Sequence, residues 1–423
     1  MTYIEFFDKN ASENIGVCLS YLPKRVILLG DDEELMLRHI ANYKKVLGKR
    51  DPKIEILYRL VAKDSLENGI AVLTDLVETY DDCVFDINGG DELLNLALGI
   101  VYGRHSDRKI QIQKIDLRNN KVFDCDKDGI TVFDKPPRLT VDENICIYGG
   151  AILYGNIHEE DKTYRWNMNA DFLRDIDLIW GVCKGNVRYW NYQSGIMEAI
   201  EEVGTRSADQ LQTVASRAAV EHYLAKKRSK YKISKGIFSY LRRNRLLLHF
   251  QDDGATITVR YKNAQVKKCL TKAGTILELK VFALANGLKN AAGLPIYHDA
   301  LTGVLIDWDG KFHNEKKDGI YDTENEIDVL LMHGIVPVFI SCKNGEVKSE
   351  ELYKLNTVAE RFGGKYAKKV LIATALEEKS EADAYLRQRA EDMQIKLIEG
   401  LQEMTDEEIG DLLRDLWSQE GGN

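Results

Sequence analysis

Short apolar runs alternate with segments of helical spacing in the first part of the chain. Three runs have the length and residue types of buried strands, at 25–30, 54–61 and 83–88. Apolar positions three or four residues apart predict helices over 32–47, 70–77 and 92–103. Strands that alternate with helices form parallel sheets with helices on their faces. We therefore expect an α/β, Rossmann-like domain over 1–150, closed by a hairpin at 109–125 with its turn at Asn119-Asn120.

The last part of the chain shows a different order of elements. A helix over 275–286 is followed by a strand at 303–308 and by two strands within 323–345 that meet at His333-Gly334. The pattern then predicts a helix, a strand, a helix, a strand and a closing helix, at 349–362, 370–374, 382–393, 395–399 and up to Trp417. A helix, three antiparallel strands, a helix and a strand are the core of a restriction-endonuclease-like α/β domain, which we place at 271–423.

The segment between these domains, 151–270, is expected to be a helical linker with a basic part. From 217 to 272 we count 15 Lys and Arg against three Asp and Glu. Helical segments there precede a predicted hairpin with its turn at Asp253-Gly254. Helices followed by a basic hairpin resemble a winged helix-turn-helix, and lysine and arginine bind nucleic-acid phosphates independently of sequence. A solvated helix face is the alternative interpretation, but the local excess of charge favours a nucleic-acid surface.

The overall composition is that of an ordinary globular protein. The 423 residues are 44% hydrophobic and 30% charged, with a net charge of −9. The seven cysteines are dispersed and form no Cys-x-x-Cys pair. This predicts reduced thiols in the cytoplasm, and argues against a disulfide framework and structural zinc. The sequence has no apolar stretch long enough to cross a membrane, and we expect no membrane partner.

The two strands within 323–345 carry the chemistry that we consider first. Side chains two apart on a strand share a face, so Glu326 and Asp328 should point one way, and Ile327 and Val329 the other. On the second strand Ser341 and Lys343 should share a face. Pairing would gather two carboxylates, a hydroxyl and an ammonium, as a metal-dependent phosphodiester hydrolase requires. A half-exposed structural hairpin is the alternative.

A third carboxylate is predicted on the helix at 275–286. Glu278 lies within the apolar face of that helix, where a carboxylate is costly unless a cation or a donor meets it. A buried pair with a nearby lysine is the structural alternative.

Two turns of the first domain are candidates for ligand binding. Ligands of such sheets bind outside the carboxyl ends of the strands. The residues at these ends are Gly30, Asp31, Asp32, Asn88, Gly89, Gly90 and Asp91. The glycines allow close approach of a ligand, and the helix starts offer free N–H groups. The aspartates suit riboses or base edges better than a pyrophosphate, and no Gly-x-Gly-x-x-Gly follows either strand.

These motifs together resemble a known family. Glu278, Asp328 and Lys343 match the PD-(D/E)xK nuclease superfamily in order and rough spacing. Four local sequences are similar to those of the CRISPR-associated ancillary nucleases of type III systems, at 270–278, 325–329, 339–345 and 361–369. In these proteins an N-terminal CARF domain binds cyclic oligoadenylate and a C-terminal nuclease domain cuts nucleic acid. The segment 86–91 resembles the nucleotide-contacting turn of CARF domains.

One position departs from the superfamily pattern. An acid usually stands two residues before the lysine, whereas this chain has Ser341. Serine is a poor metal ligand, and either Glu326 or Glu278 could supply the missing carboxylate. A degenerate domain that binds without cutting is the alternative.

The resemblance implies a homodimer that binds cyclic tetra-adenylate across its two-fold axis through the two candidate turns. Our hypothesis for activation is that the ring draws the two CARF domains together and so repositions the nuclease domains. Asp328 with Glu326 or Glu278, and the Cys342 carbonyl, would hold Mn²⁺ or Mg²⁺, while Lys343 would orient the attacking water. The substrate would be DNA, RNA or both, cut in type III CRISPR antiviral defence.

Two functions from other classes compete with this interpretation. A ligand-controlled DNA-binding regulator would use the basic segment, and its strands at 323–345 would be structural only. An oxidoreductase would bind an ordinary dinucleotide in the first domain, but the missing glycine fingerprint argues against it.

Overall fold

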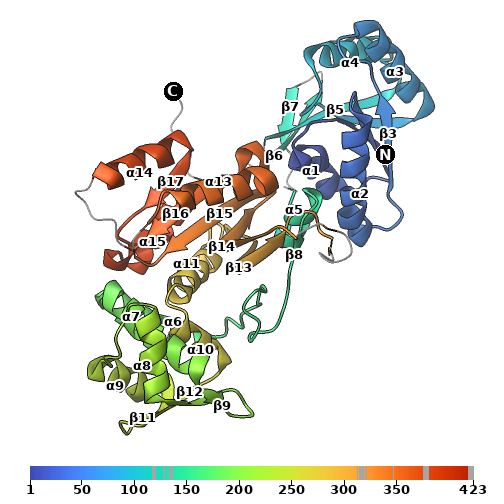
Figure 1. Cartoon of the computed structure of the whole chain (residues 1–423). Coiled ribbons are helices and arrows are strands. Elements are labelled where there is room, and N and C mark those ends of the chain that lie inside the picture. Colours follow the sequence, from blue (N-terminus) through green and yellow to red (C-terminus); the bar gives the residue numbers. More distant parts are fainter. Residues whose placement is uncertain are drawn as a thin grey trace.

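The computed structural model describes residues 1–116, 121–126, 129–132, 137–311, 313, 319, 322–345, 347–374 and 381–417. The chain forms three parts, and the C-terminal sheet lies between the N-terminal domain and the middle domain (Figure 1). The predicted fold class is confirmed: a Rossmann-like domain, a winged-helix-like middle and a C-terminal α/β domain. The predicted turn at Asn119-Asn120 lies outside the described residues.

The N-terminal domain is built on one sheet of seven strands in the order β3-β2-β1-β4-β5-β6-β7. Its strands are β1 (Thr2–Phe6), β2 (Arg25–Gly30), β3 (Glu55–Leu60), β4 (Asp82–Asp86), β5 (Lys109–Asp116), β6 (Lys121–Asp126) and β7 (Gly129–Val132). Its helices are α1 (Ala11–Tyr21), α2 (Glu33–Arg50), α3 (Leu66–Thr79) and α4 (Glu92–Arg104). The first five strands are parallel, and the last two are antiparallel.

The central strand β1 is one that the hydrophobic pattern does not reveal. Every residue of β1 is buried, including Thr2 and Glu5. Glu5 pairs in register with Asp86 of β4, so two carboxyl groups lie side by side inside the sheet. Burial followed by the charge of Asp86 raises the pKa of Glu5, and burial raises that of Asp86 to about 7. A protonated acid in this pair can donate to its neighbour, which explains how a polar sequence forms a central strand.

The middle domain has the element order of a winged helix. Its helices are α6 (Ala170–Gly185), α7 (Val187–Val203), α8 (Arg217–Lys226), α9 (Lys235–Arg243) and α10 (Ala264–Thr271). Its strands are β9 (Thr205–Arg206), β10 (Gln212–Ser216), β11 (Leu247–Asp252) and β12 (Thr256–Tyr261), in the sheet order β11-β12-β10-β9. The hairpin of β11 and β12 follows α9 directly, as the wing follows the recognition helix in that fold.

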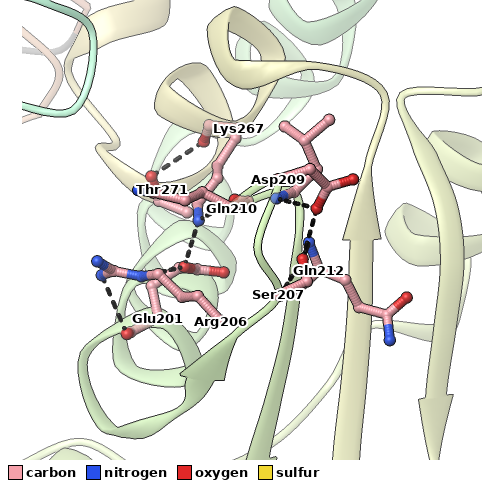
Figure 2. Close-up of polar contacts among 9 residues, drawn as sticks. Glu201, Arg206, Ser207, Asp209, Gln210, Gln212, Lys267 and Thr271 are labelled. Carbon is pink, nitrogen blue, oxygen red and sulfur yellow. Dashed lines mark hydrogen bonds and ion pairs between the residues drawn. The ribbon is translucent and has the colours of Figure 1, made fainter.

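Polar contacts fix α10 to the turn between β9 and β10 (Figure 2). The Lys267 ammonium donates to the Gln210 carbonyl at 2.8 Å and pairs with the buried carboxylate of Glu201 at 2.6 Å. The same carboxylate accepts from Arg206 at 3.2 Å. The start of α10 is capped by Asn263, whose side chain accepts from the Val266 N–H. The helix is therefore held at its start and along one side.

The C-terminal domain has a six-stranded sheet in the order β17-β16-β15-β14-β13-β8. Its strands are β8 (Ala151–Ile152), β13 (Asp299–Asp307), β14 (Glu324–His333), β15 (Val336–Lys343), β16 (Lys368–Ala373) and β17 (Ile395–Ile398). The helices around it are α5 (Val141–Ile147), α11 (Thr275–Gly287), α13 (Glu350–Gly363), α14 (Glu381–Asp392) and α15 (Asp406–Arg414), with single turns at Gly364–Tyr366 and Leu401–Glu403. Because β8 pairs with β13, the sheet includes a strand from outside the predicted range 271–423.

The C-terminal sheet is covered on both faces. Apolar side chains of α11 pack with Val329, Ile340 and Ile372 on one face. Side chains of α13 pack with Phe339 and Leu371 on the other face, together with residues of α1 and α2 from the N-terminal domain. The N-terminal domain and the C-terminal sheet therefore share one continuous core.

Candidate active site

Asp328 of β14 is the centre of a polar cluster at the end of β15. Its carboxylate accepts from the Cys342 backbone N–H at 2.6 Å and from the Ser341 hydroxyl at 3.2 Å. The Lys343 ammonium lies 3.6 Å from the same oxygen. The strands thus bring Asp328, Ser341 and Lys343 together, as their spacing in the sequence predicts.

The strict alternation expected for β14 is wrong at this point. Val329 packs on the α11 face, whereas Ile327 packs on the other face with Val304. The change occurs opposite Gly303, whose φ of +59° interrupts the pleat of β13 between the paired residues on either side. The Thr302 hydroxyl donates to the Asp328 carbonyl at 2.8 Å in this irregular segment. The consequence is that Glu326 faces α11, while Asp328 sits at the break.

Glu351, in the first turn of α13, completes the surroundings of Lys343. Its carboxylate lies 2.9 Å from the Lys343 ammonium and 3.1 Å from that of Lys354. Burial alone would lower the pKa of Lys343, but the charge of Asp328 and the hydrogen bond to Glu351 raise it. Lys343 is therefore held as a cation between two carboxylates. The sequence analysis missed Glu351, and its position in a helix first turn gives no sign of the contact.

Glu278 of α11 is buried beside this cluster, with an exposed fraction of 9%. Burial and the negative charge of Asp328 raise the pKa of Glu278 to about 8, while Lys272 opposes the shift. Burial also raises the pKa of Asp328, which Lys343 and the Cys342 N–H partly offset. Buried carboxyl groups whose ionisation is disfavoured by a neighbouring acid are typical of a site that receives a positive charge.

Glu326 lies toward solvent at the mouth of a pocket beside Glu278. The pocket is also lined by Thr302, Lys268 and Lys272. The Lys272 ammonium is 3.6 Å from the Glu326 carboxylate. Partial burial alone would lower the pKa of Lys272, but the negative charges of Glu326 and Glu278 outweigh this effect, and the pKa of Lys272 is raised. Carboxylates and ammonium groups therefore meet at the edge of the site.

The chemistry of these oxygen donors suits a hard divalent cation. Carboxylates are the ligands that Mg²⁺ and Mn²⁺ prefer, and a cation would relieve the repulsion among Glu278, Glu326 and Asp328. In the described part of the chain, however, no group of three or more His, Cys, Asp or Glu side chains is arranged to hold a metal ion. The Cys342 thiol is buried, and burial raises its pKa, so only its carbonyl fits the predicted set.

The candidate ligand turns lie on either side of the central strand of the N-terminal sheet. We call the carboxyl ends of β1, β2 and β4 the ligand edge. Asp32 caps α2 by accepting from the Leu35 N–H at 2.9 Å, and Asp91 caps α4 by accepting from Leu94 at 2.7 Å. Asp31 is exposed, with Gly30 buried beside it at the end of β2. The two caps therefore have a structural role independent of any ligand.

The turn after β4 packs tightly against β1. A Cβ on Gly89 would collide with the Phe6 carbonyl oxygen, and Gly90 has a φ of +81°. The Asn88 side chain accepts from the Ile115 N–H at 3.1 Å. These three residues are thus required by the backbone, and their contact with a ligand stays a prediction.

The sequence analysis also missed the loop that follows β1. Since β2 and β4 lie parallel on either side of β1, residues 7–10 leave the sheet at the point where the strand order reverses. Asn14 accepts from the Asp8 N–H, and Asp8 accepts from the Asn10 N–H, both at 2.7 Å. This loop lies at the middle of the ligand edge, between the two predicted turns.

A short polar chain joins the ligand edge to the C-terminal domain. The Tyr148 hydroxyl donates to Asn10 at 2.5 Å, and Arg361 at the end of α13 donates to the Tyr148 carbonyl at 2.6 Å. Because Glu351 begins the same helix, α13 is linked to the ligand edge at one end and to Lys343 at the other.

Comparisons with known proteins place this fold. No family model matches the chain, and no curated protein matches it. Protein VC1899 from Vibrio cholerae superposes with a TM-score of 0.70 at 15% identity, over 98% of this chain and 97% of that chain. Can2 from Sulfobacillus thermosulfidooxidans, solved in complex with cyclic tetra-adenylate, has a TM-score of 0.63 at 15% identity, over 99% of both chains. The predicted resemblance is thereby confirmed in fold, over the whole described chain.

Proposed function

We propose that this chain is a nuclease of type III CRISPR defence that is activated by a cyclic oligoadenylate. The observation that carries the proposal is the meeting of Asp328, Lys343 and Glu278, from two strands and a helix, in one polar cluster. The fold shared with Can2, a protein solved with cyclic tetra-adenylate, supports the same ring as the activator. DNA, RNA or both are the substrates in this proposal.

Each side chain of the cluster has a distinct task in phosphodiester hydrolysis. Asp328 with Glu278 or Glu326 would hold Mg²⁺ or Mn²⁺, which when bound lowers the pKa of water and offsets charge on the phosphate. Lys343, kept cationic by its two carboxylates, orients the attacking water or stabilises charge on the phosphoryl oxygens. Ser341 donates to Asp328 and orients it. Ser341 therefore supports the remaining acid and does not replace the missing one.

The ligand edge supplies the regulatory half of the proposal. A homodimer would place two edges around a ring that is itself two-fold symmetric. Gly30, Asp31, Asp32 and the turn 88–91 would contact the ring, together with the loop after β1. Ring binding shifts the arrangement of the nuclease domains only by as much as it favours one arrangement over the other. No helix among the described residues is long and apolar enough to cross a membrane.

A cleavage assay on labelled DNA and RNA, with Mn²⁺ and cyclic oligoadenylates of several sizes, tests the proposal. We expect ring-dependent cutting by the native chain. Lys343→Ala should reduce cutting at least about 100-fold, because one stabilising group is removed from the reacting phosphate. Ring binding, measured by calorimetry, should be unchanged. Cutting that survives Lys343→Ala would refute the site, and a lack of response to any ring would refute the activation.

A ligand-controlled DNA-binding regulator is the second candidate, and the winged-helix surface favours it. Helix α9 exposes Lys235, Arg242 and Arg243, for which no ion pair is found among the described residues. Such a regulator would bind duplex DNA in a ring-dependent manner and leave it intact with Mn²⁺. The same assay separates the two candidates.

A further inference from the structure

The pocket beside Glu278 is lined by charged side chains of both signs. Lys162, Lys268 and Lys272 line it together with Glu160, Glu278 and Glu326. Lys162 precedes the aromatic pair Tyr164 and Trp166, which also line the pocket and contact each other edge to face at 5.3 Å. The pocket opens beside the proposed reaction centre and extends toward the middle domain.

Helix α10 and its C-cap carry two of these lysines. Lys268 lies in the last turn of α10 and Lys272 directly follows the helix, and both side chains line the pocket. Lys267 points elsewhere, to the Gln210 carbonyl and the Glu201 carboxylate (Figure 2). The contacts of Lys267 therefore hold α10 so that Lys268 and Lys272 stay at the pocket.

Lys268 and Lys272 differ in their close partners, although Glu160, Glu326 and Glu278 all act on the charge of Lys268. No carboxylate lies within ion-pair distance of Lys268 among the residues that the structure describes, whereas Lys272 has Glu326 at 3.6 Å. Burial, and then the positive charge of Lys272, lower the pKa of Lys268, and the charges of Glu160, Glu326 and Glu278 offset this in part. Two neighbouring ammonium groups that repel each other would be stabilised by an anion between or beside them.

We propose that Lys268 and Lys272 bind a backbone phosphate of the nucleic-acid strand next to the phosphate that is cut. This inference rests on the proposed function and specifies how the substrate is held. The pocket adjoins Glu278 and Glu326, and helix α10 directly follows strand β12 of the wing. A strand bound across the basic middle domain would thus continue along α10 to the reaction centre. Phosphate contacts of this kind position a substrate without reading its sequence.

Binding of a labelled oligonucleotide at several salt concentrations tests the inference. The parent protein carries Lys343→Ala, so binding is measured without cutting, in the presence of the activating ring. The double variant Lys268→Gln, Lys272→Gln should bind roughly tenfold more weakly. The slope of log K against log salt should fall by about 0.7 for each phosphate of a single strand that the variant no longer neutralises. In the cutting protein, the same variant should raise KM more than it lowers kcat.

Two controls make the result specific. Lys44→Gln with Lys45→Gln removes the same charge from an exposed face of α2 and should change neither affinity nor slope. Lys268→Arg with Lys272→Arg keeps the charge and should restore binding. If the parent binds the oligonucleotide and the double variant binds it equally well, this inference is wrong while the proposed function stands. If the parent binds no nucleic acid, both fall.

Inorganic phosphate separates the two sources of a phosphate group. Suppose that calorimetry shows binding of millimolar phosphate that is lost in the double variant, while the double variant binds the oligonucleotide as tightly as the parent does. The two lysines would then form a site for free phosphate only, and the inference would be overturned.

Discussion

The ligand edge and the candidate active site are both built at strand ends, but the turn residues of the first and the acids of the second have different surroundings. At the ligand edge, Asp32 and Asp91 are occupied as helix caps, and Gly89 is fixed by its contact with Phe6. At the candidate active site, burial raises the pKa of both Asp328 and Glu278, and the charge of Asp328 raises that of Glu278 further. The chemistry proposed for this site is therefore visible in the mutual repulsion of its acids. A ligand site made of turns is difficult to tell from ordinary structure.

After Lys343→Ala, the largest effect that separates the two regions should come from Glu351→Gln. This change leaves the shape of α13 intact but removes the carboxylate 2.9 Å from the Lys343 ammonium. Lys343 would lose one of the two charges that raise its pKa and fix its position, and we expect kcat to fall about tenfold or more. Ring affinity should be unchanged. The pH profile of kcat should also move to lower pH on its alkaline side.

The exposed neighbour provides the control for that prediction. Glu350→Gln removes the same charge one residue earlier, where the side chain is exposed. It should leave kcat and its pH profile unaltered. An equal reduction of kcat in both variants would mean that the charge at the start of α13 matters, and not the contact with Lys343.

The meeting of Asp328, Ser341 and Lys343 was predictable because their strands are adjacent in sequence. The turn at His333-Gly334 sets the pairing of the two strands and thereby places Asp328 opposite Ser341 without knowledge of the rest of the fold. Glu351 was not predictable, because its contact with Lys343 depends on how α13 returns over the sheet. The predicted face of Ile327 was wrong for a related reason, because Gly303 on the neighbouring strand β13 interrupts the pleat of the sheet.

The N-terminal domain shows the same limit in another form. Strands β2 and β4 are apolar and were found, whereas the central strand β1 was missed since its Glu5 is stabilised by a partner on β4. The hydrophobic pattern around Glu5 gives no information about that partner, which lies far away in the sequence. The loop at residues 7–10, in the middle of the ligand edge, was missed with it.

An intermediate effect is expected from pH on the N-terminal domain. Burial raises the pKa of Asp86 from an ordinary value of 3.8 to about 7. The folded state therefore binds more protons than the unfolded state between these values, and its stability should fall as pH rises through this window. We expect the Tm of the native chain, without ring, to fall by several degrees between about pH 5 and pH 7.5. Asp86→Asn should flatten this dependence.

That measurement also tests the contrast between the two regions. Asp86 accepts from the Asn88 N–H at 3.0 Å, so its charge state bears on the turn at the ligand edge. If Asp86→Asn leaves the pH dependence of Tm unchanged, then the buried pair with Glu5 does not control the stability of the domain. The charges at the ligand edge would then have little effect on the stability of the domain.

The smallest effect should come from the link between the regions. Tyr148→Phe removes the hydroxyl that donates to Asn10 at 2.5 Å but keeps the ring and the carbonyl that Arg361 contacts. A hydrogen bond of this kind contributes about 1 kcal/mol. If the bond forms in only one of the two arrangements of the nuclease domains, with or without the ring, its loss would change the equilibrium between them only about fivefold. We expect a higher ring concentration at half-activation, with unaltered kcat at saturation, because the catalytic cluster is untouched. The ring of Tyr148 stays packed against the shared core in the variant, so Tm should change by only a few degrees. If the variant is activated at the same ring concentration as the native protein, then Asn10 and Tyr148 only pack the two domains together. The coupling between ring binding and cutting would in that case pass through the dimer alone.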